Sequence, residues 1–295
     1  MRKSWLPAYL ALGVVWGCSF IFIKLGLEFL TPFGVAFGRC ALGAITLLIV
    51  VRLKKIKLPK EKTTWRKLWV VAMLLNVVPG ILFAYAEVHV TSVLAGIINA
   101  TTPLATLIVM LIAFREEKLK VEQVIGLIIG ALGVMVVLGI WRGIGSNQLT
   151  GVIALLVAVT CYGISFPYST RNIIPLGLKP EAAATAQLVM AAITLLPFYL
   201  FSGISQDYYR PATIFAMLAL GVLGSGFAYI WNFSIIAAAG SSIASSVTYL
   251  TPVVAVFVGW LFLGEKIALH EPIGALLVIL GAAISQGRFN RKVQV

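Results

Sequence analysis

The chain has 295 residues, of which 60% are hydrophobic and only 11% are charged, and its formal net charge is +13. A soluble globular protein carries about 25% charged residues, so this chain lacks the polar residues needed to cover a water-facing surface. Its basic residues fall in short clusters between apolar runs, which argues against nucleic acid as a partner and makes the lipid bilayer the expected solvent.

The apolar runs have the length of membrane-spanning helices, each of which needs about 20 mostly apolar residues. Taken in chain order, the predicted spans cover residues 5–25, 32–52, 68–88, 93–114, 122–141, 151–170, 181–202, 212–236, 242–263 and 271–287. An open sheet is excluded because lipid cannot hydrogen-bond exposed backbone groups. We therefore predict an all-α membrane protein with ten transmembrane helices.

The sequence also contains an internal repeat. Residues 44–48 (AITLL) recur as 192–196, Thr102-Pro103 recurs as Thr251-Pro252, and WGCSF at 16–20 recurs as YGISF at 162–166. Because the offset between matches is nearly constant, we predict duplication of a five-helix unit. Residues 1–145 form the first repeat and residues 146–295 the second. Five is an odd number, so the second copy enters the membrane inverted, an arrangement that supports alternating access in secondary transporters.

The distribution of lysine and arginine orients the chain. With the N-terminus in the cytoplasm, 18 of the 23 basic residues fall in cytoplasmic segments, four fall outside and Arg39 lies within a span. Short cytoplasmic loops are enriched in basic residues. We expect a multi-pass protein of a bacterial cytoplasmic membrane with both termini in the cytoplasm.

No motif for catalysis, metal binding or a cofactor is present. Cys18, Cys40 and Cys161 lie in apolar runs without metal-ligand or disulfide spacing. The residues around Ser225 read GSG, not the GxSxG motif of a nucleophile, and no HExxH, GxGxxG or P-loop occurs. We expect no enzymatic activity, no metal and no cofactor.

Several motifs together resemble a known family. WGCSF at 16–20 is followed by Lys24, and the later motifs are TPL at 102–104, YLTPVVA at 249–255 and LGEKI at 263–267. In this combination the chain resembles the drug/metabolite transporter superfamily, specifically its ten-helix EamA-type members. The resemblance covers nearly the whole chain.

The resemblance implies a carrier for small metabolites, often an exporter, with a cavity between the two halves and the fifth and tenth helices at the side. Substrates across the superfamily include amino acids, sugars, nucleotide sugars and amphiphilic cations. We expect a secondary transporter of a small metabolite, either an amino acid or related compound or an amphiphilic drug-like molecule. A flippase for a lipid-linked metabolite, a channel and an intramembrane enzyme are the alternatives.

Arg39 is the ionisable residue placed well inside a span. A charge at the bilayer centre costs about 2.5–3.5 kcal/mol on insertion scales, so it needs a partner or water. Arg39 is therefore either a ligand for a substrate carboxylate or a structurally paired or snorkelling arginine.

Aromatic and amide residues are the other candidates for the cavity wall. Trp16 and Tyr162 occupy equivalent repeat positions, and Tyr85 and Tyr229 both follow Phe-Ala. The complete set of predicted substrate-binding residues is Trp16, Arg39, Tyr85, Asn99, Tyr162, Tyr229 and Tyr249. Small-molecule pockets have aromatic walls and few polar groups, although interhelical packing would use the same residues.

Pro103 and Pro252 are repeat-equivalent and are candidate hinges, with static kinks as the alternative. Glycines in the fifth and tenth spans suit either internal helix packing or a homodimer face. Carboxylates fall in loops or near span ends. Glu87 and His89, at the outer end of the third span, are the only plausible titrating pair. We interpret them as an exposed loop pair, so we expect weak or no proton coupling.

Overall fold

The computed structural model describes residues 5–113, 121–139, 141, 146–205, 211–264 and 267–285, and these are almost entirely helical. The α-helices are α1 Leu6–Gly26, α2 Pro32–Leu53, α3 Lys62–Ala72, α4 Val78–His89, α5 Ser92–Asn99, α6 Thr102–Ala113, α7 Val121–Val137, α8 Ser146–Asn172, α9 Pro180–Ser202, α10 Pro211–Gly221, α11 Ala228–Ser245, α12 Thr251–Leu263 and α13 His270–Ser285. Within the described residues the β-structure is a single bridge between Leu30 and Ile204.

Ten crossings of the membrane follow from these helices. Seven stretches are long and apolar enough to span, and the shorter helices α7 and α13 add two. One of the seven, Pro211–Leu263, has 53 residues, which is far too long for one crossing of a core about 30 Å thick. It is broken at Gly240, where φ is 81° and ψ is 173°, and so makes two crossings. The predicted ten-helix all-α fold is confirmed.

Threonine caps and prolines begin several of the helices. Thr31 Oγ1 accepts a hydrogen bond from Gly34 N at the start of α2, and Thr91 Oγ1 accepts one from Leu94 N at the start of α5. Pro32 stands in the first turn of α2, where a missing N–H leaves no helical hydrogen bond unmade.

The side-chain distribution suits a protein dissolved in lipid. Large apolar side chains such as Phe201, Phe215 and Phe262 are exposed on the outside, at 91%, 68% and 68% of their surface. Many serine, threonine and asparagine side chains are buried inside, where polar groups can hydrogen-bond between helices. The outside therefore suits lipid, while the interior also holds hydrogen-bonding side chains.

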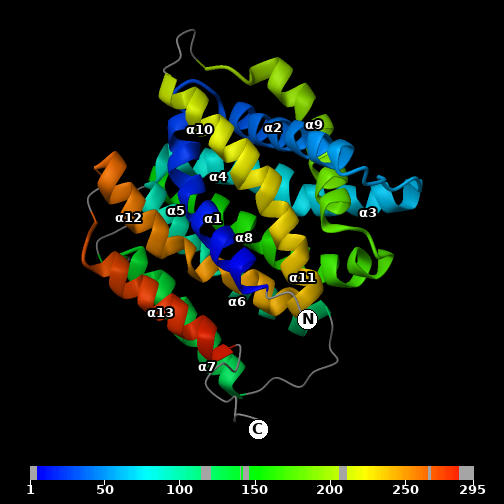
Figure 1. Cartoon of the computed structure of the whole chain (residues 1–295). Helices are drawn as coiled ribbons and strands as arrows, with labels where there is room; N and C mark the ends of the chain where they lie inside the picture. Colours follow the sequence, from blue (N-terminus) through cyan, green and yellow to red (C-terminus); the bar gives the residue numbers. More distant parts are fainter. Residues whose placement is uncertain are drawn as a thin grey trace.

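The two halves interlock. Helix α1 packs against α10, α11 and α12 of the second half, while α8 packs against α4 and α6 of the first, and α2 lies beside α9. Figure 1 shows α7 and α13 side by side at one edge of the molecule, away from the crossing of α1 and α11. This is the lateral position expected for the fifth and tenth spans.

Glycines allow α7 and α13 to touch along their backbones. A Cβ built on Gly133 would lie 2.6 Å from Val278 N, and one built on Gly281 would lie 2.4 Å from Gly130 N. Such distances leave no room for a side chain. Of the two roles predicted for these glycines, the structure shows internal packing, and a homodimer remains a prediction.

Four spans depart from regular α-helix, in two repeat-related pairs. The third and eighth spans contain π-helical turns at Met73–Val77 and Val222–Phe227, which begin 149 positions apart. The fourth and ninth spans are interrupted at residues 100–101 and 246–250. Pro103 and Pro252 stand in the first turns of α6 and α12, directly after these interruptions. They begin helices instead of kinking continuous ones, and their role as hinges stays a prediction.

Adding a methyl group at the α7–α13 contact should destabilise the protein. We expect Gly133→Ala and Gly281→Ala each to lower the free energy of unfolding by about 1–3 kcal/mol, because the new Cβ forces the two backbones apart. Thermal unfolding of the purified protein in detergent measures the effect. Gly80→Ala is the matched control, since its Cβ would meet Ala36 at an ordinary 3.5 Å. Equal losses for all three variants would contradict the close contact.

Candidate functional site

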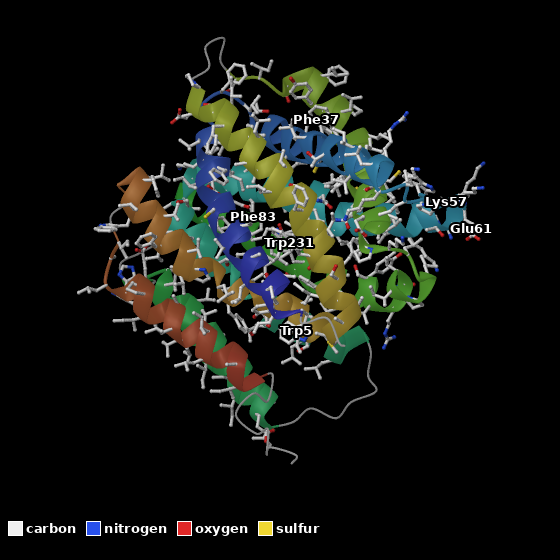
Figure 2. The ribbon with its side chains drawn as sticks, viewed as in Figure 1. Trp5, Phe37, Lys57, Glu61, Phe83 and Trp231 are labelled. Carbon is white, nitrogen blue, oxygen red and sulfur yellow. The ribbon has the colours of Figure 1, made fainter. Side chains whose placement is uncertain are left out.

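A cavity lies between the two halves, with about 480 Å³ of empty space when its opening is counted. Six aromatic side chains make up half of its lining, and the rest is polar or aliphatic. The aromatic residues are Trp16, Phe20, Phe83, Tyr162, Phe166 and Tyr229, and the others are Ser19, Ile23, Arg39, Leu75, Asn99 and Thr248. Figure 2 shows Phe83 in the middle of the bundle, whereas Lys57 and Glu61 project from one edge of it.

Five of the seven predicted binding residues line this cavity: Trp16, Arg39, Asn99, Tyr162 and Tyr229. The structure therefore brings together residues that are up to 213 positions apart in the chain.

The other two lie elsewhere. Tyr249 is buried, but it packs in a cluster with Ala100, Leu104 and Val278, while its neighbour Thr248 lines the cavity. Tyr85 is 39% exposed, with its ring against His89. Neither is part of the cavity wall.

The aromatic rings contact one another around the cavity. Trp16 and Tyr229 meet edge to face with centroids 6.1 Å apart, and Phe83 stacks on Tyr162 at 5.6 Å and lies 5.8 Å from Phe20. Contacts of this kind are worth about 0.5–1.5 kcal/mol each beyond their buried area. These ring contacts form two groups, Trp16 with Tyr229 and Phe83 with Phe20 and Tyr162, and each group joins residues of both repeats.

Arg39 supplies the positive charge of the cavity. Its side chain is only 7% exposed, and Nε donates a hydrogen bond of 3.1 Å to Ser225 Oγ. Among the described residues no carboxylate pairs with Arg39. A buried guanidinium without an anionic partner is costly, so this position favours an anion in the cavity beside it.

Gln187 is the repeat equivalent of Arg39 and makes the equivalent contact. Arg39 in α2 reaches Ser225 in the π-helical turn of the second half, and Gln187 Nε2 in α9 donates to Asn76 Oδ1 in the π-helical turn of the first half. Asn76 and Ser225 are 149 positions apart, and Arg39 and Gln187 are 148 apart. One pair of residues carries a charge and the other is neutral.

Each π-helical turn also offers a backbone carbonyl to an aromatic residue of the other half. Trp16 Nε1 donates to Gly224 O at 3.3 Å, and Tyr229 Oη donates to Leu75 O at 3.2 Å. Leu75 and Gly224 are again 149 positions apart. A π-helical turn interrupts the regular α-helical hydrogen-bond pattern and often marks a functional site. These hydrogen bonds join the two repeats at the level of the cavity.

The two halves of the chain match one and the same family model. The model of the EamA-like transporter family matches residues 3–139 and again residues 149–286. The chain belongs to the EamA-like transporter family. It is a multi-pass membrane protein and a transporter.

Relatives of this EamA-like transporter carry the same general description. The chain is 25% identical over 281 residues to the "Uncharacterized transporter YoaV" of Bacillus subtilis (strain 168), covering 95% of both chains. It is 28% identical over 280 residues to the "Uncharacterized inner membrane transporter YedA" of Escherichia coli (strain K12), covering 94% of this chain and 88% of the relative. A solved crystal structure with 17% identity has the same fold, with a TM-score of 0.71 over 97% of this chain and 99% of that chain.

The repeat explains why Tyr85 is not a cavity residue of this EamA-like transporter. The two Phe-Ala-Tyr segments are 144 positions apart, but the structure aligns this span of the two halves at an offset of 149. At that offset Tyr229 is equivalent to Gly80, not to Tyr85. The two Phe-Ala-Tyr triplets are identical in sequence but are not structurally equivalent, and only Tyr229 lines the cavity.

The same repeat could have found Thr248, which the sequence interpretation missed, because it is the equivalent of the predicted residue Asn99. Phe20 and Phe166 are also repeat equivalents, both line the cavity, and neither was predicted. Phe83 had no such signal, because its equivalent at the offset of 149 is Asn232, which is buried but not part of the cavity lining. Repeat pairs therefore predict much of the wall but not all of it.

Glu87 and His89 are not the exposed loop pair that the sequence predicted. Both belong to α4, and the side chain of Glu87 is fully buried, with no exposed surface. His89 is half-buried and contacts Tyr85, four residues earlier on α4. The predicted span 68–88 already contained Glu87, and the structure places this side chain on the buried face of the last turn of α4.

No metal centre accompanies the cavity: in the part of the chain that the structure describes, no three His, Cys, Asp or Glu side chains are grouped to hold an ion.

The Gln187–Asn76 hydrogen bond should stabilise the joint between the repeats. We expect Gln187→Leu to lower the free energy of unfolding by about 1–3 kcal/mol, because it leaves Asn76 Oδ1 buried without a donor. Adding Asn76→Leu should restore part of the loss, since both polar partners are then gone. Thermal unfolding of the two single variants and the double variant measures the coupling. If the loss of stability in the double variant equals the sum of the losses in the two single variants, the hydrogen bond is contradicted.

Proposed function

We propose that the protein moves a small metabolite with a carboxylate group, an amino acid or related compound, across the membrane by alternating access. The observation that carries this proposal is Arg39, a buried cation in the wall of a central cavity with no carboxylate of the described chain beside it. Its Nε is engaged by Ser225, which leaves the terminal nitrogens to bind a carboxylate in a bidentate way.

An acceptor for the amino group also lines this cavity. Asn99 Nδ2 donates to Thr251 Oγ1 at 3.3 Å, and Asn99 Oδ1 is buried without a partner among the described residues. An ammonium group that donates to Asn99 Oδ1 would satisfy it. Thr248, the repeat equivalent of Asn99, supplies a second hydroxyl oxygen on the cavity wall.

The six aromatic residues suit the apolar part of such a molecule. They line the same cavity as Arg39 and Asn99, and aromatic faces also attract a cationic amine. A molecule with a carboxylate, an amine and an apolar side chain would therefore use all three kinds of wall. A purely cationic amphiphile would leave Arg39 unpaired.

Alternating access is supported by the inverted repeats and by the contacts that join them. The cavity lies between two halves of the same fold and opposite orientation, which can exchange conformations. The interruptions at residues 100–101 and 246–250 are next to Pro103 and Pro252, which gives each half one place to bend. We propose export as the direction and Pro103 and Pro252 as the hinges.

We also propose a location in the cytoplasmic membrane with both termini in the cytoplasm. The excess of lysine and arginine in the segments on that side supports the orientation. The description of the Escherichia coli relative as an inner membrane transporter supports the location.

Binding of a panel of related compounds tests the role of Arg39. We expect L-phenylalanine to raise the unfolding temperature of the purified protein, whereas phenethylamine, which lacks the carboxylate, should have little effect. Arg39→Lys should weaken binding through loss of the bidentate contact, and Arg39→Gln should abolish it. Phe201→Leu, on the lipid-facing surface, is the control. Equal stabilisation of wild type and Arg39→Gln would contradict the proposal.

Thiol labelling tests the orientation. Lys57 is exposed in the loop before α3, so Lys57→Cys in a background without the three native cysteines should react with a thiol reagent. In intact cells a membrane-impermeant reagent should leave it unlabelled, and it should react after the cells are opened. Labelling in intact cells would place this loop outside.

A further inference from the structure

Glu87 is a buried ionisable group that the proposed binding site does not use. Its side chain has no exposed surface, although it lies only two residues from the end of α4. Phe83, which lines the cavity, precedes it by four residues on the same helix. Residues four apart share a helix face, and one turn rises about 5.4 Å. Glu87 therefore continues the cavity wall by one turn.

In α1, as in α4, a charged residue follows an aromatic cavity residue by four positions. Phe20 lines the cavity against Phe83, and Lys24 follows it by four residues. Lys24 Nζ donates to Glu87 O at 2.6 Å and lies 3.5 Å from Val90 O. The apolar end of the cavity is thus followed by one acidic and one basic side chain on two packed helices.

Three of the elements packed against α4 carry titratable groups. Helix α1 has Tyr9, Cys18 and Lys24, and α2 has Cys40, Arg52 and the cavity residue Arg39. Helix α8 has Cys161, Tyr168, Arg171 and Tyr162, which stacks on Phe83. Helix α5 and the π-helical turn Met73–Val77 carry none. On α4 itself, Tyr85 and His89 form a ring contact with each other on a face that is more exposed.

We propose that Glu87 is a proton-binding site through which transport is coupled to proton movement. A carboxyl group in a membrane-spanning segment is costly to keep there and is typical of proton relays. When the cavity opens on the outer side, the carboxylate takes one proton from that solution and becomes a carboxylic acid. When the cavity opens on the inner side, the acid gives the same proton to the cytoplasm and becomes a carboxylate again. No other bond changes.

The proposal rests on the proposed transport function, and it replaces the sequence-based expectation of weak or no coupling. That expectation treated Glu87 as an exposed loop residue, whereas the structure buries it one turn from the cavity wall. Coupling in opposite directions, with one proton inward for one substrate outward, would drive export.

The first test needs no substrate. The carbonyl-stretch band of protonated carboxyl groups is followed by infrared spectroscopy while the pH of the purified full-length protein is titrated. We expect wild type to show a titrating band that exchanges slowly with deuterium, and E87Q to lack it. H89Q, from the more exposed face of α4, is the control and should retain the band. An unchanged titration in E87Q would overturn the proposal. E87D keeps a carboxyl group and should show the band at a shifted frequency. This shift assigns the band to Glu87 even if E87Q folds poorly.

The second test measures coupling in proteoliposomes with L-phenylalanine as the probe. For one-to-one exchange, a gradient of one pH unit should accumulate the probe about tenfold in wild type and in H89Q. E87Q should show no accumulation but should still exchange labelled for unlabelled probe. Accumulation in E87Q equal to that of wild type, or none in a wild type that transports, would overturn the proposal. If no variant moves the probe, the proposed substrate fails, and the infrared titration decides the role of Glu87.

Discussion

Lipid cannot form hydrogen bonds with a polypeptide backbone, and this constraint governs the structure. Every backbone group that a membrane-spanning helix does not satisfy itself must find a partner inside the protein. The π-helical turns and the interruptions in the fourth and ninth spans leave such groups, and most of the residues concerned are buried. The carbonyls of Leu75 and Gly224 receive their hydrogen bonds from Tyr229 and Trp16 of the opposite half. Irregular backbone, polar side chains and the cavity therefore occur together.

The duplication gives these interior contacts their symmetry, and divergence between the copies gives them their chemistry. Arg39 and Gln187 make equivalent hydrogen bonds to opposite π-helical turns, yet only Arg39 carries a charge. Asn99 and Thr248 likewise occupy equivalent places on the wall with different side chains. A symmetric frame can exchange two conformations, whereas an asymmetric wall can bind a molecule with distinct ends. Both properties arise from one ancestral unit that was copied and then changed.

Particular residues show where sequence interpretation succeeded and where it did not. Arg39 could be found because a charge within a span is rare, and Trp16 and Tyr162 could be found because they are repeat equivalents. Tyr85 was wrongly grouped with the wall because a shared Phe-Ala-Tyr triplet imitated the repeat. Tyr249 was assigned to the wall in place of its neighbour Thr248, since a 3-10 turn at 246–249 changes which side chain faces inward. Glu87 was noticed but interpreted as exposed, because the sequence alone does not show which face of the last turn of α4 is buried.

The sequence by itself determined the number of spans and the duplication. It could do so because crossing a hydrocarbon layer imposes a length and a composition that can be counted along the chain. Only the tertiary structure decided which face of each helix borders the cavity, where the π-helical turns lie and that Arg39 meets Ser225 across 186 positions. In lipid, apolar side chains suit the outside of the bundle as well as its interior, so the sequence pattern says little about which way a helix faces. That is settled by contacts between distant segments.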